Sequence, residues 1–547
     1  MQAKATDYIK MLLNSLQSRT DRRHCHIFFS TLKMLIFLGI TLSTLLLLLY
    51  LWSRWHFSFW QRNRVNFVPC CPLLGNVRDL LLFRCNFGEQ FQRLHDHRAA
   101  NHQAFVGIHV LHNRALLLRH PELIKRVLVK DFRSFASRFE STDPVGDTMG
   151  SQNLFFTKYE CWQETHKIFT PLFAHSNVRQ MYPLLQQIGC KLEQHLAALP
   201  YDPLSASTII EVKELCALFT TDLIASLAFG VQANSLQNPH AEFRQMCIEV
   251  NKVRPLRVLH LFTMFFLPQL APKLGTHLYS PAYESFMRDS INFVIAERER
   301  SGLQRHDLID IFIRLKRAAE LSTLSSVVNK PDFFVAQAAF FLLAGFDTSS
   351  STITFALYEL AKQPDIQRRL RLEIREATLK AVTYERLTEM SYLGMVVSEV
   401  LRLYPPTTFL DRVCTTKAGY SLQPFGEFKM PQGMPIYISV LGLHRDEKLW
   451  PNPLKFDPQR FATEQKGSRD ATSYLPFGSG PRSCIGLILA LLQVKMGLIH
   501  ILKNYRVDLC PRTLTEMKFD ANAFVLAPEG GIFLQFIKDG SDEHIDG

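Results

Sequence analysis

The sequence predicts a mainly α protein that carries one transmembrane helix near its N-terminus. Three apolar runs of helix length indicate this fold class: Met34–Trp52, Phe333–Leu360 and the segment that begins at Leu487. No Gly/Ser linker, low-complexity tract or internal repeat divides the chain after its N-terminal region. The 547 residues therefore predict one large unit behind a membrane anchor.

Composition agrees with a large globular unit and excludes several other classes. Hydrophobic residues make up 47% of the chain and charged residues 20%, so the chain can bury a large core. The eleven cysteines are odd in number, scattered and without a Cys-x-x-Cys pair, which argues against a disulfide framework or a zinc site and favours a reducing compartment. The net charge of +12 raises nucleic acid as a partner, but acidic residues are interleaved with the basic ones, so we expect no nucleic acid. A solvated surface is the ordinary interpretation of this charge, and a face for an acidic redox partner is the functional one.

The uncharged stretch from Met34 to Trp52 has the length needed to cross a bilayer as a helix. It lacks the small-residue cleavage site of a secretory signal, and Trp55, Trp60 and several arginines follow it, as suits an uncleaved anchor. We therefore predict a transmembrane anchor over residues 34–53, a linker and hinge over 54–76, and the main domain over 77–547.

Residues 1–33 are basic and poor in acids, and we expect an N-terminal extension without fixed structure. Basic residues lie on both sides of the anchor, so charge does not settle the membrane orientation. A mitochondrial presequence is an alternative for this segment, although a full membrane span directly after it is unusual for that route.

The most informative segment is the glycine-rich loop Phe477–Gly486, which presents one cysteine just before a helical pattern. Gly478 permits backbone angles closed to other residues, and Gly486 leaves room for a flat ligand against the main chain. Free N–H groups and the dipole at the start of the next helix predict a lowered pKa for the Cys484 thiol. Arg482 is close enough in sequence to meet a carboxylate on such a ligand. A buried structural cysteine in a turn is the ordinary alternative.

This loop resembles the haem-thiolate signature F-x-x-G-x-R-x-C-x-G of the cytochrome P-450 superfamily at every fixed position. The resemblance implies the cytochrome P-450 fold, mainly α with small β-sheets, in which haem b (iron protoporphyrin IX) lies between an oxygen-binding helix and the helix after the cysteine loop. It implies that Cys484 is the axial ligand of the haem iron and that Phe477, Gly478, Arg482 and Gly486 lie around the cofactor. The sequence is most similar to insect microsomal members related to family six.

A second constellation lies at the middle of the apolar run Phe333–Leu360, where Ala344-Gly345-Phe346-Asp347-Thr348-Ser349 contains a glycine, an acid and a hydroxyl. Helix propensity disfavours all three at such a position, which indicates function, and a kinked core helix is the ordinary alternative. The segment resembles the oxygen-binding motif of the same superfamily. The resemblance implies that Asp347 and Thr348 relay protons during oxygen activation and that Ala344 and Gly345 lie against the haem.

Glu399 and Arg402 are three residues apart on a predicted helix that ends at Tyr404, so their side chains share a face and can pair. They match the E-x-x-R pair of the superfamily, and Phe456–Phe461 resembles its later P-E-R-F segment. The resemblance implies that Glu399, Arg402 and Arg460 form a buried ionic network with a structural role.

Haem carries two propionates, and the resemblance assigns their donors to Arg412, Arg482 and Trp162. This chain has His166 where the W-x-x-x-R motif of the superfamily has its arginine. Histidine offers one donor in place of a bidentate fork, and its charge fades near neutral pH. We therefore expect His166 to hold haem less firmly than the usual arginine.

Taken together, the resemblance implies a membrane-anchored haem-thiolate monooxygenase that inserts one oxygen atom from O2 into an apolar small molecule, such as a xenobiotic, a hormone or a lipid-like compound. The chain has no flavin or nicotinamide fingerprint, so we expect electrons from NADPH through an external NADPH–cytochrome P-450 reductase, with cytochrome b5 as an additional partner. We expect an endoplasmic reticulum (microsomal) location, in contact with membrane lipid and with the catalytic domain in the cytosol; a mitochondrial location is the alternative. Two other functions stay open: a haem-thiolate isomerase or dehydratase, and a catalytically impaired haem-binding membrane protein.

Overall fold

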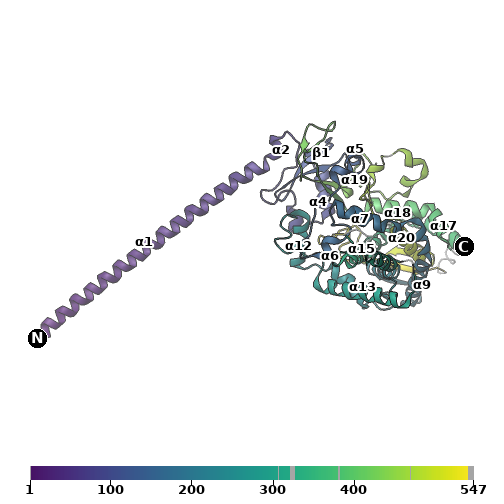
Figure 1. Ribbon diagram of the computed structural model, residues 1–547, viewed down its shortest axis with the longest axis horizontal. Helices are drawn as coiled ribbons and strands as arrows, with labels where there is room; N and C mark the ends of the chain where they lie inside the picture. The colour runs from purple at the N-terminus through teal and green to yellow at the C-terminus, as the bar shows by residue number, and fades with distance from the viewer. Residues whose placement is uncertain (1, 306, 321–326, 380–381, 469, 540–547) are drawn as a thin grey trace. The chain divides into compact units, whose positions relative to one another are not determined.

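The computed structural model describes residues 2–305, 307–320, 327–379, 382–468 and 470–539; the outer ends of the predicted domains, residues 1 and 540–547, lie outside these ranges. Within them the predicted fold class is confirmed, because helices dominate and the β-sheets are small (Figure 1). The helices in the described ranges are α1 (Gln2–Phe57), α2 (Phe59–Arg62), α3 (Arg78–Leu81), α4 (Phe87–His95), α5 (Pro121–Lys125), α6 (Thr148–Gln152), α7 (Tyr159–Phe169), α8 (His175–Gln180), α9 (Tyr182–Ala198), α10 (Val212–Ile224), α11 (Glu242–Asn251), α12 (Pro255–Phe266), α13 (Pro281–Ser301), α14 (Leu308–Glu320), α15 (Phe333–Lys362), α16 (Pro364–Thr378), α17 (Tyr384–Glu389), α18 (Ser391–Leu403), α19 (Val440–His444) and α20 (Leu487–Leu502).

The described strands form three small sheets. The strands are β1 (Phe105–Val110), β2 (Asn113–Leu118), β3 (Ser207–Glu211), β4 (Phe409–Val413), β5 (Tyr420–Ser421), β6 (Lys429–Met430), β7 (Pro435–Ser439), β8 (Tyr505–Leu509) and β9 (Phe533–Lys538). The largest sheet has the order β1-β2-β7-β4, with β2 and β7 parallel and the other neighbours antiparallel. The second has the order β3-β9-β8, and β5 pairs with β6. In the largest sheet, Arg412 of β4 lies opposite Ile436 of β7.

The chain divides into two compact units, Met1–Arg64 and Val65–Gly547. In the second unit, α15 is the central helix, and it packs against α10, α13 and α20 (Figure 1). Its residues are apolar around most of the helix, and most of them are buried, as expected for a core helix. The helix predicted over Phe333–Leu360 is therefore confirmed, with two more residues at its C-terminal end.

Two described helices are long and apolar enough to cross a membrane: Ser30–Phe57 within α1, and α15. The second is a core helix, since 61% of its apolar window is buried. The first unit differs from our expectation of an unstructured extension, because α1 runs without a break from Gln2 through the predicted anchor. The sequence from residue 2 to residue 38 contains no glycine or proline, so nothing in it interrupts the helix.

The second half of the predicted linker, residues 65–76, belongs to the large unit. Asn76 holds it there, because its side-chain amide donates to the carbonyl of Pro69 at 3.0 Å and its Oδ1 accepts the backbone N–H of His109 in β1 at 2.8 Å. Only residues 54–64 of the predicted linker fall in the smaller unit.

Candidate active site

The cysteine loop is a tight turn that ends at the start of α20. Gly478 and Gly480 have φ of 71° and 74°, in the left-handed region that favours glycine. A Cβ atom on Gly480 would lie 1.9 Å from the carbonyl oxygen of Leu128, so no other residue fits there. The N–H of Cys484 donates to the carbonyl of Phe477 at 2.9 Å. The loop is thus closed by its own backbone and presents the cysteine at a defined position.

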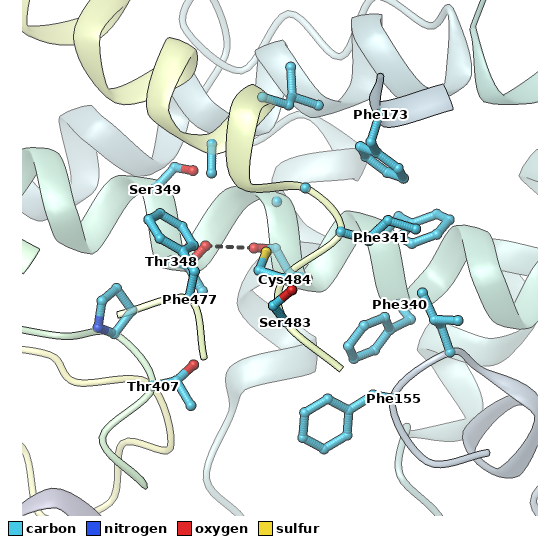
Figure 2. A pocket seen from close by; sticks show the side chains of 18 of the residues that line it. Phe155, Phe173, Phe340, Phe341, Thr348, Ser349, Thr407, Phe477, Ser483 and Cys484 are labelled. Atoms are coloured by element: carbon cyan, nitrogen blue, oxygen red, sulfur yellow. Dashed lines mark hydrogen bonds between the residues drawn. The ribbon is translucent and has the colours of Figure 1, made fainter. Parts of the chain in front are cut away.

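A largely apolar cavity of about 280 Å³ lies beside this loop. Figure 2 shows Cys484 and Thr348 at this space together with the rings of Phe155, Phe173, Phe340 and Phe341. The predicted site residues that line the cavity are Ala344, Gly345, Thr348, Trp162, His166, Phe477, Gly478, Arg482, Cys484 and Gly486. Of the predicted catalytic and cofactor-binding residues, Asp347 and Arg412 do not line it, and neither do the three residues of the predicted ionic network, Glu399, Arg402 and Arg460.

The Cys484 side chain is open to the cavity but surrounded by protein. Burial raises the pKa of its thiol, and a hydrogen bond from the backbone N–H of Gly486 lowers it by less. Our expectation of a lowered thiol pKa is wrong for the protein alone, because loss of water outweighs the amides at the start of α20. A bound metal ion deprotonates a coordinating thiol regardless of this shift.

The middle of α15 forms one wall of the cavity. Thr348 Oγ1 donates to the carbonyl of Ala344 at 2.7 Å, which leaves its lone pairs free to accept from a group in the cavity (Figure 2). Gly345 also has a packing role, because a Cβ atom there would lie 2.6 Å from Cδ1 of Ile224 in α10. The glycine therefore lets α10 approach α15 closely beside the site.

Asp347 does not face the cavity with Thr348. Its Oδ1 accepts from Lys213 Nζ at 2.8 Å, and its Oδ2 accepts from Asn251 Nδ2 at 3.2 Å. Successive side chains on an α-helix point about 100° apart, so neighbours in sequence do not share a face. The structure thus separates the predicted acid from the predicted hydroxyl.

Two predicted propionate donors, Arg412 and Arg482, are buried. Arg482 donates from Nε to the carbonyl of Ala136 at 3.1 Å and from Nη2 to the carbonyl of Thr157 at 2.9 Å, and its guanidinium lies 4.3 Å from the centre of the Trp162 ring. Its Nη1 is the one terminal arginine nitrogen, among the described residues, that is buried without a hydrogen-bond partner. Arg412 Nε is also buried without such a partner.

Sequence reasoning missed Arg138, which lines the same cavity. Its Nη1 donates to Asp411 Oδ1 at 3.1 Å, and its guanidinium lies 3.9 Å from the centre of the Phe155 ring. Burial and the charges of Arg138 and Arg412 lower the pKa of Arg482, because nearby positive charges disfavour its cationic form. No motif surrounds Arg138, so the sequence held no local signal for it.

We call these residues and their neighbours the arginine cluster: Arg138, Arg412, Arg482, Lys158, Asp411 and Glu140. Burial and the neighbouring Asp411 raise the pKa of Glu140 well above its usual range. The cluster therefore holds at least two more positive than negative groups, and a buried cation without a counter-ion is costly. Two carboxylates on a ligand would balance this excess and pair with the unpartnered nitrogens, so the residues fit a haem with its two propionates.

His166 and Trp162 form one side of the cavity, with ring centres 5.0 Å apart. Burial and the charge of Arg482 lower the pKa of His166, so its ring is neutral near pH 7. Its Nδ1 lies 3.1 Å from Thr170 Oγ1. His166 therefore reaches the site as a neutral group.

The structure brings Glu399, Arg402 and Arg460 together, and we call these three residues the Glu399 network. Arg402 donates to the two carboxylate oxygens of Glu399, from Nε at 2.7 Å and from Nη2 at 2.8 Å, and both side chains are fully buried. Arg460 Nε lies 3.4 Å from Glu399 Oε1. Arg402 Nη1 donates to the carbonyls of His444 and Pro453, each at 2.8 Å.

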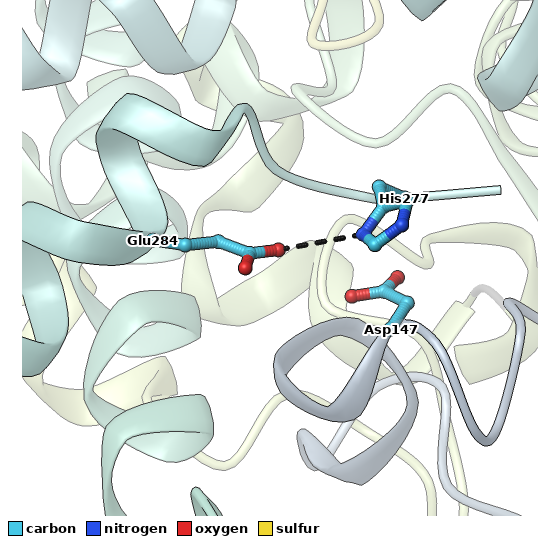
Figure 3. Close-up of side chains that lie close together, drawn as sticks. All are labelled: Asp147, His277 and Glu284. Atoms are coloured by element: carbon cyan, nitrogen blue, oxygen red, sulfur yellow. Dashed lines mark ion pairs between the residues drawn. The ribbon is translucent and has the colours of Figure 1, made fainter. Parts of the chain in front are cut away.

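A separate cluster of Asp147, His277 and Glu284 lies outside the cavity, with its ligand-type atoms within 4.8 Å of one another (Figure 3). His277 Nδ1 lies 3.7 Å from Glu284 Oε1, and Glu284 Oε2 accepts from Arg288 at 3.3 Å. The two oxygens of Asp147 accept backbone N–H groups at 2.8 and 2.9 Å. Because each carboxylate already has protein partners, we interpret this cluster as a tie between the start of α6 and α13.

Comparison with known proteins agrees with this site. The family model of cytochrome P450 matches residues 69–535. The chain is similar to Probable cytochrome P450 6t1 of Drosophila melanogaster, with 58% identity over 501 residues, 90% of this chain and 93% of that protein. It is 41% identical over 509 residues to Probable cytochrome P450 6g2 of the same species, covering 91% of this chain and 98% of that one. Cytochrome P450 6k1 of Blattella germanica is 36% identical over 522 residues, which cover 91% of this chain and 96% of the relative. The chain therefore belongs to the cytochrome P450 family of monooxygenases, among relatives that are insect members of family six.

Proposed function

We propose that this chain is a microsomal monooxygenase that inserts one oxygen atom of O2 into an apolar small molecule. Ser30–Phe57 anchors it in the endoplasmic reticulum membrane, and the large unit works in the cytosol. Electrons come from NADPH through an external NADPH–cytochrome P-450 reductase, with cytochrome b5 as an additional donor. The apolar helix in α1, the absence of a flavin or nicotinamide fingerprint and the insect relatives support this proposal.

The cofactor in this proposal is haem b, whose iron Cys484 would hold through its sulfur. When bound, haem would supply the redox chemistry of oxygen activation, and the thiolate of Cys484 would tune it. The proposal rests on one observation: Cys484, Thr348 and Arg482, whose Nη1 lacks a partner, border a single apolar cavity. Arg482, Arg412 and Arg138 would hold the propionates, and Trp162 would support Arg482 through its ring.

The chain's own residues exclude water and orient the substrate. Phe155, Phe340 and Phe341 border the cavity with apolar rings, which favours an apolar substrate of a few rings or an alkyl chain. Few polar groups compete for it, so the substrate's position depends on shape more than on hydrogen bonds. The substrate class is accordingly a xenobiotic, a hormone or a lipid-like compound.

The hydroxyl group of Thr348 lies at the cavity wall, where it can take part in proton transfer. Its hydroxyl hydrogen is directed to the carbonyl of Ala344, so Oγ1 can accept a hydrogen bond from a water or from the reacting group. Asp347 would supply protons to this position only after it leaves Lys213 or through a water that spans the two faces of α15. We therefore assign Thr348 to the site and Asp347 to its proton supply.

One observation favours the alternative of a haem-thiolate isomerase or dehydratase: Asp347 is engaged by Lys213 and Asn251 away from the cavity. An enzyme of that kind needs no reductase and no proton relay. Turnover of apolar compounds that depends on NADPH and reductase would separate the two functions, since only the monooxygenase consumes NADPH.

The reduced carbon monoxide difference spectrum of the purified protein tests the cofactor assignment. We expect a band at about 450 nm for a thiolate-ligated haem and its loss in Cys484→Ser. A Cys484→Ser variant that keeps the pigment with an unchanged visible spectrum would overturn the assignment of Cys484. Ser483→Ala, which changes the neighbouring residue and leaves the sulfur, is the matched control and should keep the band.

A further inference from the structure

The segment His444-Arg445-Asp446 lies outside the cavity, yet its histidine contacts the segment that leads into the cysteine loop. His444 is the last residue of α19 and is fully buried. Its ring lies between α18, which carries Arg402, and Leu475, the residue two positions before Phe477. A buried polar ring at such a junction is a candidate for positioning the loop.

Two hydrogen bonds determine the state of the His444 ring. The backbone N–H of Leu475 can only donate, and it lies 2.8 Å from Nε2, so Nε2 is the acceptor. Nδ1 lies 3.1 Å from the carbonyl oxygen of Arg402, which can only accept, so Nδ1 carries the proton. Burial and the charge of Arg402 lower the pKa of His444 to about 3, so the ring stays neutral at neutral pH. The two partners thus select one neutral tautomer.

Backbone hydrogen bonds connect Leu475 to the turn that carries the cysteine. The carbonyl of Leu475 accepts the N–H of Gly478 at 3.0 Å, which starts the turn, and the carbonyl of Phe477 accepts the N–H of Cys484 at 2.9 Å. Leu475 is buried, so its N–H has no water to replace the histidine. The residue that follows is proline, which has no N–H of its own to offer.

On its other side, His444 makes two hydrogen bonds to Arg402 of the Glu399 network. Its ring donates to the carbonyl of Arg402, and its own carbonyl accepts from Arg402 Nη1 at 2.8 Å. Tyr474 stacks on the ring, with centres 5.3 Å apart, and donates to the carbonyl of Ser398 in α18 at 2.9 Å. The charges of Arg402 and Arg445 both lower the pKa of this ring.

We propose that His444 is a positioning residue for the Cys484 loop, in which a single neutral ring sets the distance between Arg402 of α18 and Leu475. The Glu399 network then holds the cysteine sulfur at its place through this ring as well as through the fold. The inference rests on the proposed haem-thiolate function, because its effect is read on the iron–sulfur bond.

The test uses the holoenzyme of three variants. His444→Phe keeps the ring that stacks on Tyr474 and removes both nitrogens, so Leu475 loses its acceptor. An unpaired buried N–H favours displacement of the loop, and we expect the ratio of the band at about 450 nm to the shorter-wavelength band of thiolate-free haem to fall on the order of tenfold. His444→Gln, whose carbonyl reaches the position of Nε2, should restore most of the ratio. His444→Asn, which reaches only the position of Nδ1, should not.

Gln367→Leu is the matched control for lost stability. Gln367 is buried and bridges backbone groups of α15 and β8, at 3.0 Å from the carbonyl of Leu360 and 2.8 Å from that of Val507. We expect this variant to unfold at a lower temperature and to keep the wild-type spectrum.

The inference is overturned if His444→Phe keeps the wild-type band ratio and haem-loss rate while it loses as much thermal stability as Gln367→Leu. Equal ratios in His444→Gln and His444→Asn would also overturn it, and this comparison remains if His444→Phe does not fold. A wild-type protein that lacks the band at about 450 nm would contradict the proposed function instead, whatever the variants do.

Discussion

The Glu399 network and the arginine cluster are both buried groups of charges, and they differ in the hydrogen bonding of Arg402 and Arg482. In the Glu399 network, Nε, Nη1 and Nη2 of Arg402 all donate to protein oxygens. In the arginine cluster, Arg482 Nη1 and Arg412 Nε have no hydrogen-bond partner, although both residues are buried. Buried polar groups are normally paired, and Arg482 lines the cavity, so we expect its unpaired Nη1 to mark where a partner binds.

This difference separates a structural role from a ligand-binding role more clearly than composition does. Both groups contain arginines and carboxylates, and both would be counted as buried salt bridges. In the Glu399 network both arginines are already paired with Glu399. Arg402 makes two hydrogen bonds to it, and Arg460 makes an ion pair at 3.4 Å, although Arg460 Nε has no hydrogen bond. The network should therefore stabilise the fold without a ligand. The arginine cluster has an excess of positive charge and should become favourable only with an anionic ligand bound.

The largest effect should come from breaking the Glu399 network. In Arg402→Leu, Glu399 loses its bidentate partner while it stays buried, and removal of one member of a buried pair costs about 3–5 kcal/mol. We expect the free energy of unfolding to fall by that amount, measured by denaturant unfolding followed by far-ultraviolet circular dichroism.

Arg368→Leu is the control with the same spacing on a helix. Arg368 lies 3.0 Å from Asp365 in an i,i+3 pair, but the side chains are 72% and 92% exposed. Exposed pairs contribute little, so we expect no measurable change. If both variants unfolded at the same denaturant concentration as wild type, the Glu399 network would not be structural.

The next largest effect should come from the arginine cluster and should appear in haem binding. Arg482→Gln removes the charge and the unpaired Nη1 but keeps an amide that can donate to a backbone carbonyl. A charge-assisted hydrogen bond contributes about 1.5–3 kcal/mol, so we expect haem loss to a scavenger protein to be at least about tenfold faster. The circular dichroism and the yield of folded protein should change little.

Arg402→Leu should therefore lower the stability of the fold, whereas Arg482→Gln should mainly release haem. An unchanged haem-loss rate in Arg482→Gln would show that the unpaired nitrogen does not mark the propionate site.

Much of the fold and of the cysteine loop follows from local patterns in the sequence. The helix over Phe333–Leu360 and the one that begins at Leu487 were predictable because apolar residues continue over helix length. The turn at Gly478 was predictable because only glycine adopts its backbone angles easily. The pairing of Glu399 with Arg402 follows from their i,i+3 spacing.

The remainder depends on contacts that are distant in sequence. Arg138 meets Asp411 across 273 positions, and no local pattern around either residue predicts it. The direction of the Cys484 pKa shift depends on how much water the folded protein removes, which a sequence does not report. The orientation of Asp347 away from the cavity was partly foreseeable from helix geometry, but its partner Lys213 comes from another helix.

A smaller effect should come from adding a positive charge beside the arginine cluster. His166 is neutral near pH 7 because burial and Arg482 lower its pKa. In His166→Arg, a permanent fork of donors would face the propionates, and we expect haem loss to slow by a few fold, about 1 kcal/mol. His166→Gln, which adds a donor without a charge, should leave the rate near that of wild type. Faster haem loss in His166→Arg would mean that repulsion from Arg482 outweighs the new pairing.

The smallest effect should come from the ion pair between Lys213 and Asp347, which is only partly buried. Its side chains are 22% and 14% exposed, and Lys213 also donates to the hydroxyls of Ser350 and Ser351, each at 2.8 Å. A partly exposed pair contributes less than about 1 kcal/mol, so Lys213→Met should change stability little. It should, however, release Asp347 and alter the ratio of product formed to NADPH consumed by less than about threefold. Asp347→Asn, which keeps the hydrogen bonds and removes the acid, should lower that ratio more than Lys213→Met does. Equal ratios in wild type and Asp347→Asn would remove Asp347 from the proton supply and leave Thr348 to act with water alone.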